Sequence, residues 1–238
     1  MNNTTFDRAS LRLSATLLLV GQILYVLVTL LHTGGEANHH STIFAAYAAS
    51  GNWTAVHAAQ FACMAIFLAG LFALFFALDA QTEVARWAGR FGAAFTVVAL
   101  ALCGGVLAVD GVALKQAVNA WANATEHEKA ARFAVAEAVR WLEWGMRSYE
   151  NFALGLAVLL FAVAVLGTAW IPSGIAYLMG LSAITYFVQG WVAGTDGFSQ
   201  THTIAIVLAE VLNVAWMTWL LVVAWRLPDP GRKLRRAP

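Results

Sequence analysis

Six histidines are the residues of this chain best suited to bind a metal, and all of them fall at or near the same ends of long apolar runs. Neutral imidazole is a good ligand near pH 7 because its unperturbed pKa is about 6.5. The grouping indicates a polar site that opens to one compartment. The histidines are His32, His39, His40, His57, His127 and His202.

Histidine nitrogens with one carboxylate commonly coordinate zinc, copper or iron, and imidazole is also the usual axial ligand of haem. His32, Glu36 and His39 have the i, i+4, i+7 spacing of one helix face, but two intervening glycines favour a loop. No HEXXH pattern or other complete metal motif is present. The alternative is that these histidines cap helices, bond backbone carbonyls or titrate at the interface. The predicted metal ligands are His32, Glu36, His39, His40, His57 and His202, and the candidates for haem are His57 and His202.

Other ionisable residues are predicted to support catalysis. Arg147 and Glu150 adjoin an apolar run, where ionisable groups normally face the bundle interior and have partners. They would orient a substrate or transfer protons. Glu210 lies deep in the last run, so we expect it to be protonated or paired with Arg147, and to close the cavity floor. The predicted catalytic set is Arg147, Glu150, Glu210 and Asp110, with Lys115 and Asp196 close by.

Six apolar runs must position these side chains. The chain is 61% hydrophobic and 11% charged, and about 20 apolar residues suffice to span a bilayer. The first run is too long for a signal-peptide core and has no cleavage site after it. We therefore predict an all-α integral membrane protein, a single domain over 1–238 with a six-transmembrane-helix bundle. The predicted spans are 11–33, 54–78, 91–113, 148–169, 174–193 and 203–225.

Two further elements are predicted on the histidine side. The apolar pattern continues beyond the third run, so residues 112–147 should form an extended helical hairpin outside the bilayer. Alternating charges over 126–140 favour a solvated, salt-bridged face. Residues 41–50 should form a short helix capped by Ser41, lying on the membrane or covering a cavity.

Basic residues predict the orientation. Arg8, Arg12, Arg86 and Arg90 share one side with the basic tail 226–238, while the opposite loops carry no Lys or Arg. The positive-inside rule makes that side cytoplasmic, with both termini inside. Eleven Arg against three Lys in an Ala-rich chain suggest a bacterial inner (plasma) membrane.

Tryptophans fit the same orientation as interface anchors. Trp53 and Trp191 would lie at the outer interface, and Trp87, Trp170 and Trp225 at the inner one.

Three classes of function fit these features. The favoured one is a metal- or haem-dependent membrane enzyme or cofactor protein, such as an oxidoreductase, holding zinc, iron, copper or haem. The alternatives are a metal-free binding or sensing protein for a small or lipid-like ligand, and a proton-coupled transporter using Glu210. Transport is disfavoured because the inner halves of the runs offer few polar residues. The lipid bilayer is the expected partner, and self-association into a homo-oligomer is compatible with the sequence.

Several other classes are excluded. A net charge of +1 argues against nucleic acid as a partner. The absence of a phosphate-binding loop, a GxSxG elbow and a CxxC motif argues against an ATPase, an α/β-hydrolase and a thiol oxidoreductase.

Overall fold

The structure is a computed structural model that describes residues 7–78 and 82–227, and most of these residues are helical. No β-strand occurs in either range. The elements are α1 (Arg8–Thr29), α2 (His40–Ala49), α3 (Trp53–Ala77), α4 (Glu83–Ala108), the π-helix η1 (Val109–Leu114), α5 (Lys115–Ala122), α6 (Lys129–Leu166), α7 (Ser173–Asp196) and α8 (Gln200–Arg226).

Six helices in the described ranges are long and apolar enough to cross a membrane. They are α1, α3, the continuous run from α4 through η1 to α5, α6, α7 and α8. This confirms the predicted all-helical chain with six apolar segments of spanning length. The predicted tail lies outside the described residues from position 228 onward.

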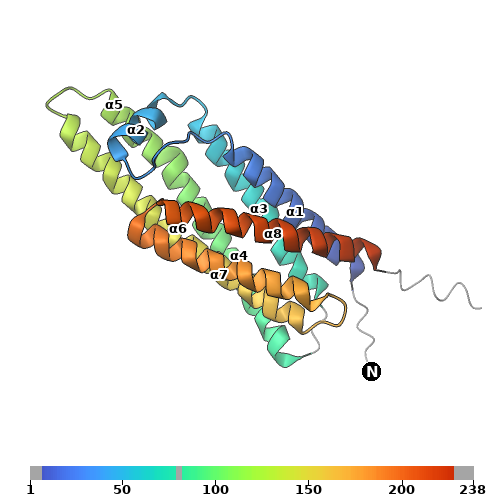
Figure 1. The fold of residues 1–238 in the computed structure, drawn as a ribbon. Coiled ribbons are helices and arrows are strands. Elements are labelled where there is room, and N and C mark those ends of the chain that lie inside the picture. The colour runs from blue at the N-terminus through green and yellow to red at the C-terminus, as the bar shows by residue number, and fades with distance from the viewer. Residues whose placement is uncertain (1–6, 79–81, 228–238) are drawn as a thin grey trace, which may run out of the picture.

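The six long helices pack as a ring in which sequence neighbours lie side by side, and α8 closes the ring against α1 (Figure 1). The short helices α2 and α5 lie together at one end, which we call the α2 end. Packed side chains that include Leu18, Phe161 and Leu220 fill the opposite half of the ring. A smaller apolar cluster, which includes Phe44 of α2 and Trp53 of α3, packs α2 against its neighbouring helices. Apolar side chains therefore fill one half of the ring, and the other half has room for a site.

Two predicted boundaries at the α2 end are wrong. Helix α1 ends at Thr29 and not near 33, because the backbone N–H of His32 bonds the Thr29 carbonyl at 3.0 Å in a tighter final turn. Helix α2 begins at His40, and its N-cap residue is His39 and not Ser41. Both differences place a histidine just outside a helix; His32 is partly buried there, whereas His39 is exposed.

Helix α5 and the first part of α6 pack against each other beyond the bundle, as two arms joined through residues 123–128. Residues 126–140 are predicted to form a solvated, salt-bridged face, and this prediction is wrong for residue 140. The Arg140 residue is 2% exposed, and Glu143 is 1% exposed. They are buried because α2 and the α7–α8 turn cover this part of α6: Arg140 contacts Tyr47 of α2 and Phe198 of the turn.

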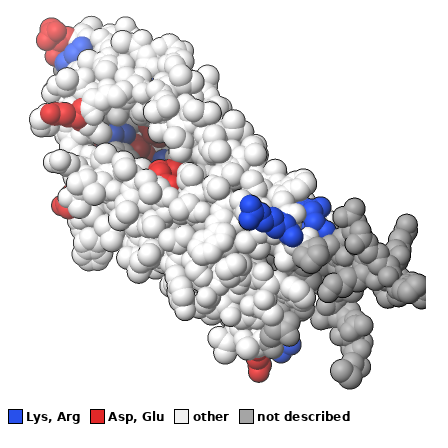
Figure 2. Space-filling model, turned by 45° about the vertical axis from the view of Figure 1, so that its right-hand side comes forward, with Lys and Arg blue, Asp and Glu red and all other residues white. Residues whose placement is uncertain are grey.

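The surface separates charge from apolar area. Figure 2 shows a hollow near one end with acidic and basic side chains inside it, basic side chains near the other end, and a broad uncharged surface between. At the basic end Arg12 lies 4.6 Å from the centre of the Trp225 ring and bonds the Ala224 carbonyl. Helices α1 and α8 are thus fastened together at the end opposite the hollow.

Helices α1 and α3 approach closely enough to require glycine. A Cβ on Gly70 would lie 2.7 Å from the Leu18 backbone nitrogen, and the Ser14 hydroxyl donates to the Gly70 carbonyl at 2.8 Å. We expect Gly70→Ala to lower the free energy of unfolding by about 1–3 kcal/mol, because overpacking forces the helices apart. Thermal unfolding in detergent measures the loss. The control is Gly180→Ala, where no atom lies within 4 Å of the added Cβ, and an equal loss there would contradict this packing.

Lys115 fastens the C-terminal end of α2. Its ammonium donates to the carbonyls of Tyr47, Ala48 and Ser50 at 2.7 to 2.8 Å. We expect Lys115→Met to speed amide hydrogen exchange in α2 while sparing α7, because hydrogen bonds from a charged group each contribute about 1.5–3 kcal/mol. Unchanged exchange in α2 would show that apolar packing alone holds this helix. Lys115, which is predicted to lie close to the site, thus caps the C-terminal end of α2.

Candidate metal centre

A cavity of about 320 Å³ occupies the α2 end of the ring. Its wall draws on the loop after α1 and on every long helix, and it includes six charged residues. It stops at Gln22, Leu154 and Glu210, roughly where the apolar packing begins. The charged residues lining it are Asp110, Arg140, Glu143, Arg147, Glu150 and Glu210.

His57 lies behind this cavity's wall, with its Nε2 beside Asp110, which lines the cavity. It lies in the second turn of α3 and is 2% exposed. Its Nδ1–H donates to the Trp53 carbonyl at 2.7 Å, since a carbonyl can only accept. The other nitrogen, Nε2, lies 2.9 Å from Oδ2 of Asp110. A proton or a metal cation must lie between these atoms, because a lone pair facing a carboxylate is repulsive.

His32 has the same arrangement from the opposite side. Its Nδ1–H donates to the Thr33 carbonyl at 3.0 Å, so Nε2 of the neutral ring carries the lone pair. Burial lowers the pKa of His32, which keeps the ring neutral and able to bind a cation at pH 7. The His32 and His57 ring centres are 5.1 Å apart. Backbone carbonyls thus hold both rings with a proton on Nδ1. Groups that hydrogen-bond the second ring nitrogen of metal-bound histidines commonly do the same.

Asp110 reaches the histidines from the π-helix η1. The indole of Trp53 donates to the Asp110 carbonyl, and the Thr54 hydroxyl donates to the Gly111 carbonyl, both at 2.8 Å. A Cβ on Gly111 would lie 2.5 Å from the Cβ of His57, so glycine permits the close approach of η1 to α3. Short π-helical segments such as η1 are frequent at functional sites. The Oδ1 atom of Asp110 is buried without a hydrogen-bond partner among the described residues.

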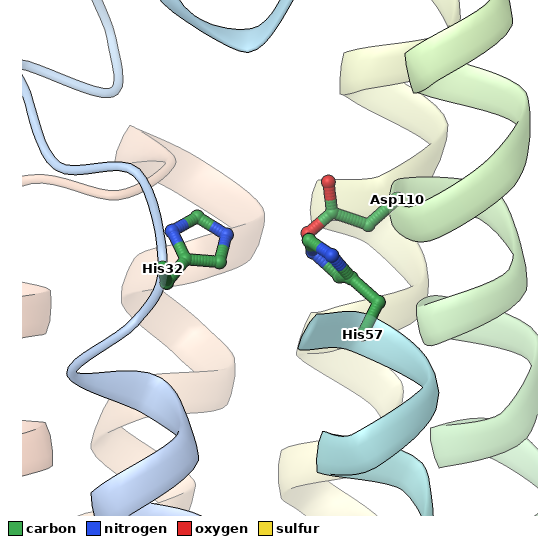
Figure 3. A group of neighbouring side chains, drawn as sticks. All are labelled: His32, His57 and Asp110. Atoms are coloured by element: carbon green, nitrogen blue, oxygen red, sulfur yellow. The ribbon is translucent and has the colours of Figure 1, made fainter. Parts of the chain in front are cut away.

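Together His32, His57 and Asp110 form a group that could hold a metal ion, here called the triad (Figure 3). Each residue offers one ligand atom, and these atoms lie within 4.8 Å of one another. Ligand atoms of a tetrahedral site with bonds of about 2.0–2.1 Å are ~3.3 Å apart. The His57 and Asp110 atoms, at 2.9 Å, are near that spacing, and the His32 ring would have to move toward them to bind zinc or iron. Two of the three residues line the cavity, which leaves one side of the triad open to it.

Two ion pairs lie beside the triad on α6. Arg140 donates to Glu143 at 2.6 Å, and Arg147 donates to Glu150 at 2.7 Å. The pairs are seven residues apart, or about 10 Å along the helix. Each arginine is already neutralised by its own carboxylate, so the wall they form is polar but carries little net charge.

Glu210 forms the inner limit of the cavity. Its carboxyl oxygen Oε2 accepts a short hydrogen bond from the Gln22 side-chain amide of α1. The predicted pairing of Glu210 with Arg147 is wrong, because Arg147 bonds the glutamate one turn further along its own helix. Glu210 instead joins α8 to α1 at the base of the cavity.

The structure places the other predicted ligands away from the triad. Glu36 and His39 are exposed and pair with each other at 2.5 Å. His40 bonds Glu137 at 2.9 Å. His202 lines the cavity from α8, and its Nε2 is buried without a partner among the described residues. Asp196, which was predicted only to lie close to the site, is not part of the cavity lining and accepts a hydrogen bond through its backbone carbonyl from Asn38.

Other functional positions are missed by the sequence patterns. Trp53 is 2% exposed, so its prediction as an interface anchor is wrong. It packs between Tyr47 and His57. Its indole N–H donates to the Asp110 carbonyl, and its own carbonyl accepts from Nδ1 of His57. Its spacing of four residues before His57 was the available signal, since i and i+4 share a helix face. Tyr25 and Gln60 also line the cavity and carry no such signal.

No protein-family model matches the chain, and no curated protein or solved structure is significantly similar to it. The chemistry of the cavity therefore has to be argued from the geometry of its own side chains.

Proposed function

We propose that the protein is a metal-dependent integral membrane enzyme whose centre is the triad. The observation that carries the proposal is the matched orientation of two histidines. His32 and His57 each donate from Nδ1 to a backbone carbonyl, Nε2 of His57 lies 2.9 Å from Asp110, and the His32 ring has its other nitrogen on the side of these two residues (Figure 3). Two imidazoles and one carboxylate form the donor set of iron(II) oxygenases and are close to the sets that hold zinc in hydrolases.

The open side of the triad supports an enzyme over a structural metal site. Structural zinc sites are closed by four protein ligands, whereas catalytic sites keep a position for water or substrate. Here three ligands converge at the cavity wall, and the Arg147–Glu150 pair lines the same cavity. That pair can orient a polar substrate, and Glu150 can carry a proton. The metal identity then selects hydrolysis or oxidation.

The placement in the cell follows the basic residues. The apolar helices are consistent with a bilayer, and we propose a bacterial inner membrane with both termini in the cytoplasm. The triad would then open on the outer side, where the loop 30–39 and α2 lie. Transport is less well supported, because packed apolar side chains such as Leu71, Phe161 and Met217 fill the ring inward of Glu210 in the described part of the chain.

Cobalt(II) tests both parts of this proposal. Purified protein stripped by a chelator should take up one equivalent of cobalt, with visible absorption bands that shift when azide is added. Asp110→Asn should abolish uptake, and Glu150→Gln should preserve it, because only the first side chain belongs to the triad. Cobalt uptake without an azide effect would indicate a closed site and contradict an enzyme. No stoichiometric uptake would contradict a metal centre.

A further inference from the structure

The cavity has an opening on the side of the bundle, between the outer halves of α1 and α8. Thr29 of α1 and Ile206 of α8 both line the cavity and are exposed residues, so the cavity reaches the surface between the two helices. Below them the Gln22–Glu210 hydrogen bond closes the gap, and further down Arg12 ties α1 to α8. No hydrogen bond joins the two helices above Glu210 within the described residues. Figure 2 shows the hollow with charged groups in its depth.

The loop 30–39 forms the upper edge of this opening. Asn38 donates to the Asp196 carbonyl at 2.8 Å and accepts from the Phe198 backbone N–H at 3.0 Å. These two bonds fasten the loop to the α7–α8 turn. The opening is thus framed by α1, α8, the fastened loop and the Gln22–Glu210 bond, and we call it the side opening.

The depth of the side opening places it in the outer half of a bilayer. A hydrocarbon core of about 30 Å takes ~20 helical residues. Counted from Arg12 and Ala224, which meet at the basic end, the core extends to about residue 32 on α1 and about residue 204 on α8. The side opening lies between this level and Glu210. Its frame is apolar outside, with Leu27 54% and Leu208 51% exposed.

The charge of the cavity indicates which polar group it would accept. Arg140 and Arg147 are each paired with a glutamate. The two remaining carboxylates of the lining, Asp110 and Glu210, would balance a divalent metal ion in the proposed centre. The described lining thus offers no unpaired cationic side chain to hold an anion. A group with balanced charge fits this lining best, because a net charge would stay uncompensated away from water.

We propose that the substrate is an outer-leaflet lipid with a zwitterionic head, which enters through the side opening and keeps its acyl chains in the membrane. The head then lies among the α6 ion pairs and reaches the open side of the triad. This inference rests on the proposed function, since it supplies the substrate class of the same centre. It requires no change in the ring, because the opening exists already.

Photolabelling tests the inference. Protein is reconstituted in vesicles of phosphatidylethanolamine and phosphatidylglycerol with trace phosphatidylethanolamine carrying a diazirine on its head. Light should label the α6 peptide around Arg147 and Asn151, which line the cavity. Ile206→Trp or Thr29→Trp should each reduce that labelling about tenfold, as a loss of ~1.4 kcal/mol would. The matched controls Leu208→Trp and Leu27→Trp place the same ring on exposed positions outside the cavity lining and should label as the wild type does.

Three results would overturn the inference. One is an unlabelled α6 peptide in the wild type, and another is equal labelling of the blocked variants and their controls. The third is displacement of the probe by excess phosphatidylglycerol more readily than by excess phosphatidylethanolamine. Labelling is measured with and without metal. Specific labelling in a protein that binds no metal would defeat the proposed function alone, and metal binding without labelling would defeat this inference alone.

Discussion

Purified His57→Ala protein should be folded and nearly free of metal. We expect its affinity for zinc or iron(II) to fall at least about 100-fold. Removing a residue that only hydrogen-bonds a metal ligand already lowers metal affinity 10–100-fold. The imidazole is a ligand in our proposal, and it also accounts for the orientation of Asp110, which it contacts at 2.9 Å. Metal analysis after gel filtration measures the loss, and circular dichroism checks the helices.

The control for this variant is His39→Ala. His39 is also a predicted ligand, but it is exposed and contacts Glu36. We expect full metal content in that variant. If both variants retained metal, or if both lost it, the triad would not be the centre.

Breaking the Arg140–Glu143 pair should give the largest loss of stability. Arg140→Met leaves the Glu143 carboxylate almost fully buried without its cation, and breaking a buried pair in this way costs about 3–5 kcal/mol. The contacts of Arg140 with the Tyr47 hydroxyl at 3.2 Å and with the Phe198 ring at 4.7 Å are lost as well. Unfolding in detergent should show the decrease.

A double-mutant cycle separates the buried charge from the packing. Arg140→Met combined with Glu143→Leu should recover a large part of the loss, because apolar residues of similar volume replace buried ion pairs well. Additive losses in the double variant would show that the two side chains contribute separately, and that their ion pair is not the cause.

The helices could be predicted from the sequence because apolar runs of spanning length leave few alternatives. The ends of the helices could not, because they depend on single contacts. The apolar run of α1 continues to Leu31, yet a tight turn ends the helix at Thr29 and brings His32 to the triad. In the same way, Thr82 caps α4 well before the apolar run starts, by accepting from the Ala85 N–H.

The site could be predicted only in outline. The sequence identifies histidines at one end of the bundle, but not which two meet, because that depends on how helices far apart in sequence pack. The sequence predicts a catalytic role for Asp110 and not metal binding, since the π-helix that turns it toward His57 has no sequence signature. Alternating charge on α6 likewise predicts a solvated face until tertiary packing covers it, as it does at Arg140.

The central claim is that His32, His57 and Asp110 bind one metal ion, and an anomalous diffraction map of crystals soaked in zinc tests it most directly. We predict a single strong peak among these three side chains, with two nitrogens and one carboxylate oxygen at about 2.0–2.2 Å. A peak at Glu36 and His39, or at His40 and Glu137, with none at the triad would contradict the claim. So would a map with no ordered peak.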